Sequence, residues 1–340
     1  MAVKMPTPTP QPSPALFFET INAYHSTAAL KTALELELFT AISEGAHTAS
    51  ELARRCQASE RGVRILCDYL VVLGFLTKDQ QRYGLTADSA TFLVRTLPAY
   101  LGNTTGFLCS PEAMRSYDDL TEVVRQGRQL EESYITHENP LWVEFARSMS
   151  GFMRLPAELI AARLGAAQGR KWKVLDVAAG HGIFGVTIAR LNPNADIVAL
   201  DWPAVLEVAQ ANAANSGVAS RYRTLAGSAF EVDFSSGYDV VLLTNFLHHF
   251  DVPTCESLLR KVYAALAPNG RVATLEFVPN EDRVSPPIPA KFALIMLAGT
   301  PAGDAYTFSE LRSMFQNAGF SRSELHTLDP SPHSLVISYR

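Results

Sequence analysis

The chain has 340 residues, 47% hydrophobic and 19% charged, a balance typical of a globular protein long enough for two domains. Its net charge of −5 argues against nucleic acid as the main partner, because phosphate binding requires a basic surface. No apolar run reaches membrane-spanning length, and the Pro-rich residues 1–15 predict a disordered tail and no signal peptide. The four cysteines lack C-x-x-C or zinc-like spacing, which predicts free thiols, no metal site and a cytoplasmic location.

Residues 16–100 predict a mainly helical domain of the winged-helix type. The stretches SELARRC and SERGVRILCDYLVVLGFL have helical spacing, with Ser50 and Ser59 as expected N-caps, and two short strands around a polar turn follow. The second helix is apolar over most of its length, which favours dimerisation over reading DNA. A domain of about 100 residues would struggle to bury this surface alone, so we expect a homodimer, with a DNA-binding regulator as the minor alternative.

Residues 101–165 predict a helical linker that contributes to a substrate pocket. The sequence between Asn139 and Gly165 is amphipathic. Aromatic and methionine side chains recur there at helical spacing, which suits either an ordinary core or an adaptable pocket for a flat ligand. The candidates from this region are Trp142, Phe145, Met149, Phe152 and Met153.

Residues 166–340 predict an α/β domain. Short apolar runs such as KVLDVA, DIVALD and YDVVLLTNFL alternate with helical segments from Lys171 onward, which is typical of a doubly wound parallel sheet. The stretch SELHTLDPSPHSLVISYR has two strands joined by a Pro-Ser-Pro turn, which predicts an antiparallel hairpin at the sheet edge. Ligands of such folds bind at the carboxyl ends of the strands.

The first strand of this domain leads into a loop with the spacing G-x-G-x-x-G at residues 180–185. That spacing alone does not distinguish NAD from other adenosine cofactors. Asp176 ends the strand, and a carboxylate there would repel a pyrophosphate but suits the ammonium and sulfonium of S-adenosylmethionine. The small residues Ala178, Gly180 and Gly182 let a ligand lie close to the backbone.

The second strand ends in Asp201, whose carboxylate can accept hydrogen bonds from both ribose hydroxyls of either cofactor. Trp202 follows and can cover the adenine. Asp176 and the closing hairpin therefore favour S-adenosylmethionine, with NAD as the alternative.

Five motifs make the sequence resemble the small-molecule O-methyltransferases of plants and bacteria, of the caffeate and hydroxyindole type. Where that family usually has DVGGGxG, DLPxV, xGDMF and xHDWSDxxC, this chain has DVAAGHG, DWPAV, AGSAF and LHHFDVPTC, and it has AGF at 318–320. The resemblance begins at about Phe17 and implies a class I Rossmann-like domain, a winged-helix dimerisation domain and a homodimer. It also implies methyl transfer from S-adenosylmethionine to a hydroxyl of a small aromatic or polyketide-like compound, without a metal.

The resemblance places His248 on the catalytic histidine of the family and His249 on the aspartate that follows it. A histidine is a suitable general base for a phenol because its pKa lies near neutrality. Adjacent side chains point in different directions, so we do not expect both rings to reach one acceptor. Glu276 matches a glutamate that orients the base, whereas Ala305 stands where the family has a second glutamate and Asp304 is out of register.

The cofactor site departs from the family pattern at three positions. Ser228 replaces an aspartate that contacts adenine, Thr244 replaces a lysine of many plant members, and Ala178 replaces a glycine, which is acceptable if its φ is negative. We expect the rest of the cofactor site to include Ala229, Phe230 and Asn245.

The acceptor pocket is expected between the sheet and the helical region. Its further candidates are Asn245, His249, Phe292, Ile295 and Met296. The departures at Ser228 and Ala305 leave open a homologue that keeps the cofactor site but catalyses hydroxylation, decarboxylation or ring closure.

Overall fold

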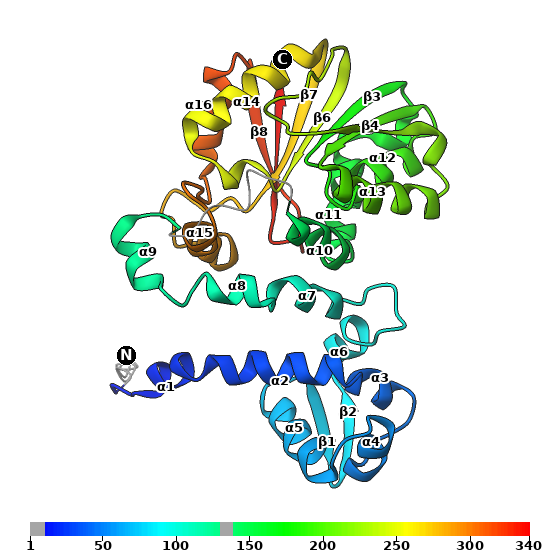
Figure 1. The fold of residues 1–340 in the computed structure, drawn as a ribbon, viewed down its shortest axis with the longest axis vertical. Coiled ribbons are helices and arrows are strands. Elements are labelled where there is room, and N and C mark those ends of the chain that lie inside the picture. The colour runs from blue at the N-terminus through cyan, green and yellow to red at the C-terminus, as the bar shows by residue number, and fades with distance from the viewer. Residues whose placement is uncertain (1–10, 130–138) are drawn as a thin grey trace, which may run out of the picture. The chain divides into compact units, whose positions relative to one another are not determined.

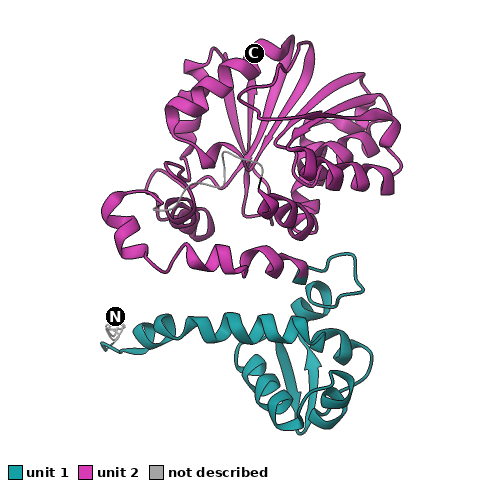
Figure 2. Cartoon of the chain, viewed as in Figure 1, with its two compact units in different colours: residues 1–102 teal, residues 103–340 magenta. Residues whose placement is uncertain are grey.

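A computed structural model describes residues 11–129 and 139–340, and the chain divides into two compact units, residues 1–102 and 103–340 (Figure 2). Of the predicted tail, residues 1–15, residues 1–10 lie outside the described residues, and α1 begins at Ala15. The four cysteines are all unpaired. Within the described ranges, no helix combines the length and apolar character needed to cross a membrane.

The first unit has six helices and a two-stranded antiparallel sheet among its described residues, in the winged-helix order. Its elements are α1 (Ala15–Ile21), α2 (Ala23–Glu35), α3 (Leu38–Ser43), α4 (Ala49–Arg55), α5 (Glu60–Val72), β1 (Leu76–Asp79), β2 (Arg82–Leu85) and α6 (Ala87–Phe92). Ser59 caps α5 as expected, by accepting a hydrogen bond from the Gly62 N–H. The prediction of Ser50 as a cap is wrong, because Thr48 and Glu51 form a capping box that starts α4 earlier.

Helix α1 buries none of its residues within this unit. Its large apolar side chains are exposed, with Leu16 at 75% and Phe17 at 64% of their full accessible area. Apolar surface of this extent on one short helix is typical of a surface that is covered by another molecule.

The second unit begins with helices α7 (Thr105–Leu108), α8 (Pro111–Arg115), α9 (Leu120–Gln126), α10 (Pro140–Met149) and α11 (Arg154–Leu164). Helix α10 starts where its sequence predicts, since Asn139 accepts a hydrogen bond from the Leu141 N–H and Pro140 occupies the first turn. The apolar face of α11 packs into the core beneath the sheet.

A seven-stranded sheet follows, in the order β5-β4-β3-β6-β7-β9-β8 (Figure 1). Its strands are β3 (Trp172–Val177), β4 (Ala195–Asp201), β5 (Tyr222–Ala226), β6 (Tyr238–Thr244), β7 (Leu266–Glu276), β8 (Arg322–Thr327) and β9 (Ser334–Tyr339). The first five are parallel, and β8 and β9 form the expected antiparallel hairpin on β7. The prediction of a doubly wound α/β fold with a closing hairpin is therefore confirmed.

Helices cover both faces of this sheet (Figure 1). α12 (Ile183–Leu191) and α13 (Pro203–Asn215) pack with α11 on one face, and α14 (Val252–Ala265) and α16 (Phe308–Asn317) pack on the other. α15 (Pro287–Gly299) follows β7. The chain leaves β3 towards β4 and returns to its other side at β6, so the loops after β3 and β6 diverge at the carboxyl edge. A ligand site is expected in that crevice.

Candidate active site

The glycine loop after β3 bends through three left-handed residues. Gly180 and Gly182 have φ angles of +56° and +69°, and Ala178 has a φ of +52°. A Cβ at Gly182 would overlap the Tyr222 hydroxyl, so only glycine fits there. Alanine in place of the family's glycine at position 178 was expected to be acceptable if its φ were negative, and its φ is positive. Its methyl group costs the folded state about 1 kcal/mol in this conformation.

Asp176 lies beneath this loop and is completely buried. Its Oδ2 accepts a hydrogen bond of 3.1 Å from the Gly185 N–H at the start of α12, whereas Oδ1 has no partner among the described residues. Burial raises the pKa of this carboxyl to about 8. Asp176 therefore holds the first turn of α12, and its raised pKa weakens the charge argument that the sequence offered for the cofactor.

Asp201 ends β4, and its carboxylate binds the backbone of the glycine loop. Its Oδ2 accepts a hydrogen bond of 2.8 Å from the Gly180 N–H, and its Oδ1 accepts one of 2.7 Å from the Trp202 N–H. Burial raises its pKa to about 6, and these two N–H groups oppose that rise. Each oxygen keeps a second lone pair for a ligand hydroxyl.

Two adjoining pockets open at this edge and share Ala178, Asp201, Trp202 and Phe246. The first pocket is also lined by the glycine loop, by two aromatic side chains of α10 and by residues around the end of β6. Besides the shared residues, its lining is Trp142, Phe145, Ala179, Gly180, His181, Phe184, Val205, Thr244, Asn245 and His249. The second extends along the loop after β5, and its remaining lining is Leu200, Gly227, Ser228, Ala229, Phe230, Glu231 and Phe250. The structure thus brings together the candidate cofactor residues, apart from Asp176 and Gly182, which support the loop.

His248 and Glu276 form a buried pair at the carboxyl ends of β6 and β7. His248 Nδ1 lies 2.5 Å from Glu276 Oε2. The other oxygen of Glu276 accepts hydrogen bonds from the N–H groups of Phe246 and Leu247, at 3.1 and 2.9 Å. The carboxylate is therefore locked in place, and it leaves Nε2 as the ring atom available to another molecule.

His249 lines the first pocket, 5.8 Å from the Trp142 ring. The ring centroids of the two adjacent imidazoles lie 4.3 Å apart, and the ring planes are tilted by 59°. Burial, with His248 as a second cause, lowers the pKa of His249 well below its ordinary value, so its ring is neutral. Its Nδ1 is buried and has no partner within the described chain.

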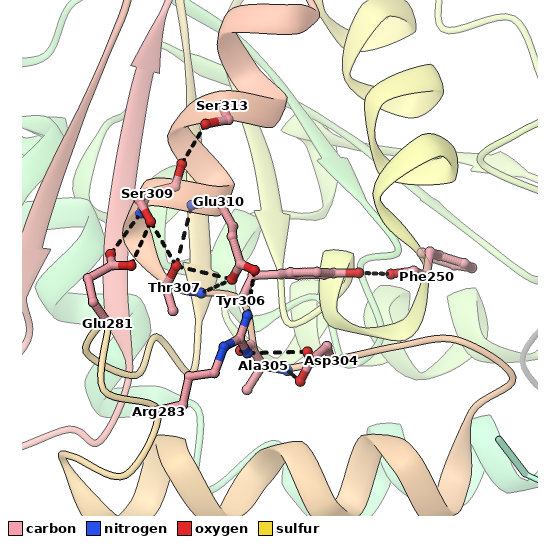
Figure 3. Close-up of polar contacts among 10 residues, drawn as sticks. All are labelled: Phe250, Glu281, Arg283, Asp304, Ala305, Tyr306, Thr307, Ser309, Glu310 and Ser313. Carbon is pink, nitrogen blue, oxygen red and sulfur yellow. Dashed lines mark hydrogen bonds and ion pairs between the residues drawn. The ribbon is translucent and has the colours of Figure 1, made fainter. Parts of the chain in front are cut away.

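Asp304 does not replace the second glutamate of the family. Figure 3 shows its side chain directed at Arg283, with Nη1 to Oδ2 at 3.3 Å, and Arg283 also pairs with Glu310. Ala305 itself is buried. Within the described part of the chain, Glu276 is the carboxylate that contacts the His248 ring.

The other acceptor-pocket candidates separate into three groups. Trp142, Phe145 and Asn245 line the first pocket, and Phe292 packs edge-on against His248 at 4.8 Å. Met149, Met153 and Met296 are buried, with Met153 Sδ accepting a weak hydrogen bond from the Asn245 amide at 3.5 Å. Ile295 is exposed.

Several pocket residues escaped the sequence analysis, and His181 and Phe246 are two of them. His181 is the first variable residue of the G-x-G spacing, so its position in the loop was a usable signal. Its Nδ1 accepts a hydrogen bond from the Ile183 N–H, and burial lowers its pKa to about 4. Phe246 borders both pockets but resembles any core aromatic in sequence.

The doubly wound sheet, the antiparallel hairpin that closes it, and the glycine loop bound by Asp201 at the end of β4 are together the features of a class I methyltransferase. The O-methyltransferase domain matches residues 117–321, and the O-methyltransferase dimerisation domain matches residues 18–95, so the chain belongs to the O-methyltransferase family. It is an S-adenosylmethionine-dependent enzyme, which confirms the cofactor prediction over NAD.

Three known proteins illustrate this relationship. The 3-hydroxy-5-methyl-1-naphthoate 3-O-methyltransferase of Streptomyces sahachiroi is 29% identical over 93% of this chain and 92% of its own length. A solved Nostoc punctiforme protein assigned to the O-methyltransferases is 53% identical, with a TM-score of 0.93 over 97% of this chain and 100% of that one. Human N-acetylserotonin methyltransferase, solved in complex with SAM, shares the fold at 20% identity, with a TM-score of 0.83 over 99% of both chains.

The residues at the two pockets fit the cofactor. Asp201 offers free lone pairs for ribose hydroxyls, and a Cβ at Gly180 would meet nothing within 4 Å, so the backbone is open to a ligand. The amide oxygen of Asn245 is buried without a partner among the described residues and can accept a hydrogen bond. Metal ligation was not expected, and no group of three or more His, Cys, Asp or Glu suited to a metal occurs in the described ranges.

Proposed function

We propose that the enzyme methylates a hydroxyl group of a small aromatic or polyketide-like compound, with His248 as general base. The observation that carries this proposal is the buried His248–Glu276 pair. The pair adjoins the aromatic-lined pocket through His249, which lines the pocket and whose ring centroid lies 4.3 Å from that of His248. The S. sahachiroi relative acts on a hydroxynaphthoate, which is a flat compound of the same class.

We assign the two ends of the cofactor to the two pockets. Asp201 would hold the ribose, Ser228, Ala229 and Phe230 would surround the adenine in the second pocket, and the glycine loop with Thr244 and Asn245 would border the remainder. When bound, the cofactor supplies a methyl group activated by the positive charge on its sulfur.

The chain's own part in the reaction is positioning and proton removal. Glu276 accepts a hydrogen bond from His248 Nδ1–H, so the unprotonated Nε2 can take the proton of an acceptor hydroxyl. The resulting imidazolium is stabilised by the same carboxylate, which its two backbone N–H donors hold still. Trp142 and Phe145 would orient a flat acceptor and exclude water.

The test is incubation of the full chain with S-adenosylmethionine and hydroxynaphthoates, followed by mass spectrometry of the products. A mass increase of one methyl group on the hydroxyl supports the proposal. A product changed in another way would favour the second candidate, a non-methylating homologue, which the buried Ala305 and the neutral Ser228 keep open.

We also propose a homodimer formed through the N-terminal helices, because α1 exposes its apolar side chains. The dimerisation domain of the family covers these helices from residue 18. A cytoplasmic location is supported by the four free thiols. The acidic net charge supports the absence of a nucleic-acid partner.

A further inference from the structure

His333 lies at the carboxyl edge of the sheet, and nothing in the proposed mechanism uses it. It directly precedes β9, and the register of the antiparallel pair sets its neighbour Ser334 opposite Glu276 of β7. His333 is 1% exposed. The hairpin thus brings a third imidazole to the edge that carries His248.

An aromatic wall joins His333 to the proposed base. Its ring lies 4.1 Å from that of Phe277 and 5.8 Å from that of Phe152. Phe277 stacks on Phe292 at 4.2 Å, and Phe292 meets His248 edge-on at 4.8 Å. A flat aromatic compound at this wall would have one imidazole near each end.

The Nε2 atom of His333 is buried and has no hydrogen-bond partner among the described residues. A polar atom left in this state is costly, and native chains rarely keep one without a ligand or a water to satisfy it. Burial and the proximity of His248 lower the pKa of His333 to about 3, so the ring is neutral.

Ser331 is the hydrogen-bond partner of His333 Nδ1. Its Oγ accepts a hydrogen bond of 3.3 Å from the His333 backbone N–H and lies 3.0 Å from Nδ1, and either atom of this second contact can be the donor. In the tautomer in which the Ser331 hydroxyl donates to Nδ1, the ring hydrogen is on Nε2, and the unpartnered atom is then a donor that requires an oxygen.

We infer that His333 Nε2–H binds a second oxygen of the acceptor, a carbonyl or carboxylate oxygen that lies across the aromatic ring system from the hydroxyl to be methylated. The preferred substrate class is a hydroxylated, fused-ring aromatic ketone or acid. This inference rests on the proposed function and extends the acceptor site from Trp142 and Phe145 of the first pocket, past His248, to the Phe277–Phe292 wall. His333 is then a specificity-determining residue.

The experiment compares three probes that share one ring and one hydroxyl: 2-naphthol, 3-hydroxy-1-naphthoate and the corresponding methyl ketone. The wild-type enzyme should show kcat/KM values for the acid and the ketone about tenfold to a hundredfold above that for 2-naphthol. In His333→Phe this preference should disappear through KM, while the rate on 2-naphthol and the affinity for S-adenosylhomocysteine stay unchanged. His333→Gln, whose amide can donate in place of Nε2–H, should restore part of the preference.

His326→Phe is the matched control, because His326 lies on β8 of the same hairpin but its buried Nε2 lies 3.7 Å from Glu324 Oε2. It should leave the preference intact. Equal loss on all three probes in His333→Phe, or no preference in the wild type, would overturn the inference and assign His333 to packing.

A binding experiment distinguishes failure of this inference from failure of the proposed function. If none of the probes is methylated, each is titrated by calorimetry into the full chain loaded with S-adenosylhomocysteine. Tighter binding of the acid and ketone that is lost in His333→Phe supports the role of His333 although methyl transfer has failed. Equal affinities, or no binding of any probe, reject it.

Discussion

Replacing Glu276 by glutamine should inactivate the base without removing it. Two backbone N–H groups, from Phe246 and Leu247, bind Oε1, so the amide oxygen of a glutamine must take that position. The amide NH2 then faces His248 Nδ1, which lies 2.5 Å from Oε2 in the native pair. Nδ1 becomes an acceptor, the ring proton moves to Nε2, and the ring can no longer take a proton from the acceptor.

Holding the base in the wrong tautomer should lower the turnover rate by a factor on the order of 10²–10⁴. Glu276→Gln should therefore be about as inactive as His248→Ala, with the affinity for S-adenosylhomocysteine nearly unchanged in both. Single-turnover methyl transfer and calorimetry measure the two quantities, and Glu112→Gln on an exposed helix is the control. If Glu276→Gln retains more than a tenth of the wild-type rate, Glu276 does not set the tautomer of the base.

Four other predictions follow from the loop, the carboxylates and the first helix. Ala178→Gly should raise the free energy of unfolding by about 1 kcal/mol, measured in urea, because the φ of +52° suits glycine; a decrease would contradict the strain. Asp201→Ala should weaken S-adenosylhomocysteine binding by about 1.5–3 kcal/mol in calorimetry, and an unchanged Kd would remove it from the ribose role. Burial raises the Asp176 pKa from 3.8 to about 8, so between pH 3.8 and about pH 8 the folded chain holds a proton that the unfolded chain has lost, and the free energy of unfolding falls as the pH rises. Asp176→Asn should flatten this fall, measured by urea unfolding between pH 5 and 8. Parallel pH curves for the variant and the wild type would refute the prediction. Phe17→Asp should shift the chain towards monomer in light scattering, whereas an unaltered dimer would place the contact elsewhere.

The layers of the fold could be predicted because local patterns determine them. Apolar runs from Lys171 onward alternate with helical spacing, and buried parallel strands have this appearance. The start of α4 was misplaced although its signal was present, since Thr48 and Glu51 have the spacing of a capping box. Ser50 is an equally good cap in isolation, and only the glutamate distinguishes the two.

The chemistry of individual site residues was harder to predict, because it depends on what lies above and below each one. The sequence places Asp176 at a strand end, but its burial under the loop, and the resulting high pKa, come from α12 packing over it. The left-handed φ of Ala178 arises from closing the loop and has no signature in an alanine. His333 joins the site through a hairpin far along the chain, a non-local contact that spacing does not reveal.

The position of β9 between β7 and β8 affects how the protein can be made. β7 carries Glu276, and among the described residues its outer edge pairs with β9, at residues 334–339. During synthesis, β7 therefore emerges from the ribosome with a row of open N–H and C=O groups and waits while more than fifty further residues are added. An unpaired, apolar edge is prone to intermolecular pairing. Chains stalled before residue 334 should consequently aggregate, and the active site forms only after translation has passed this point.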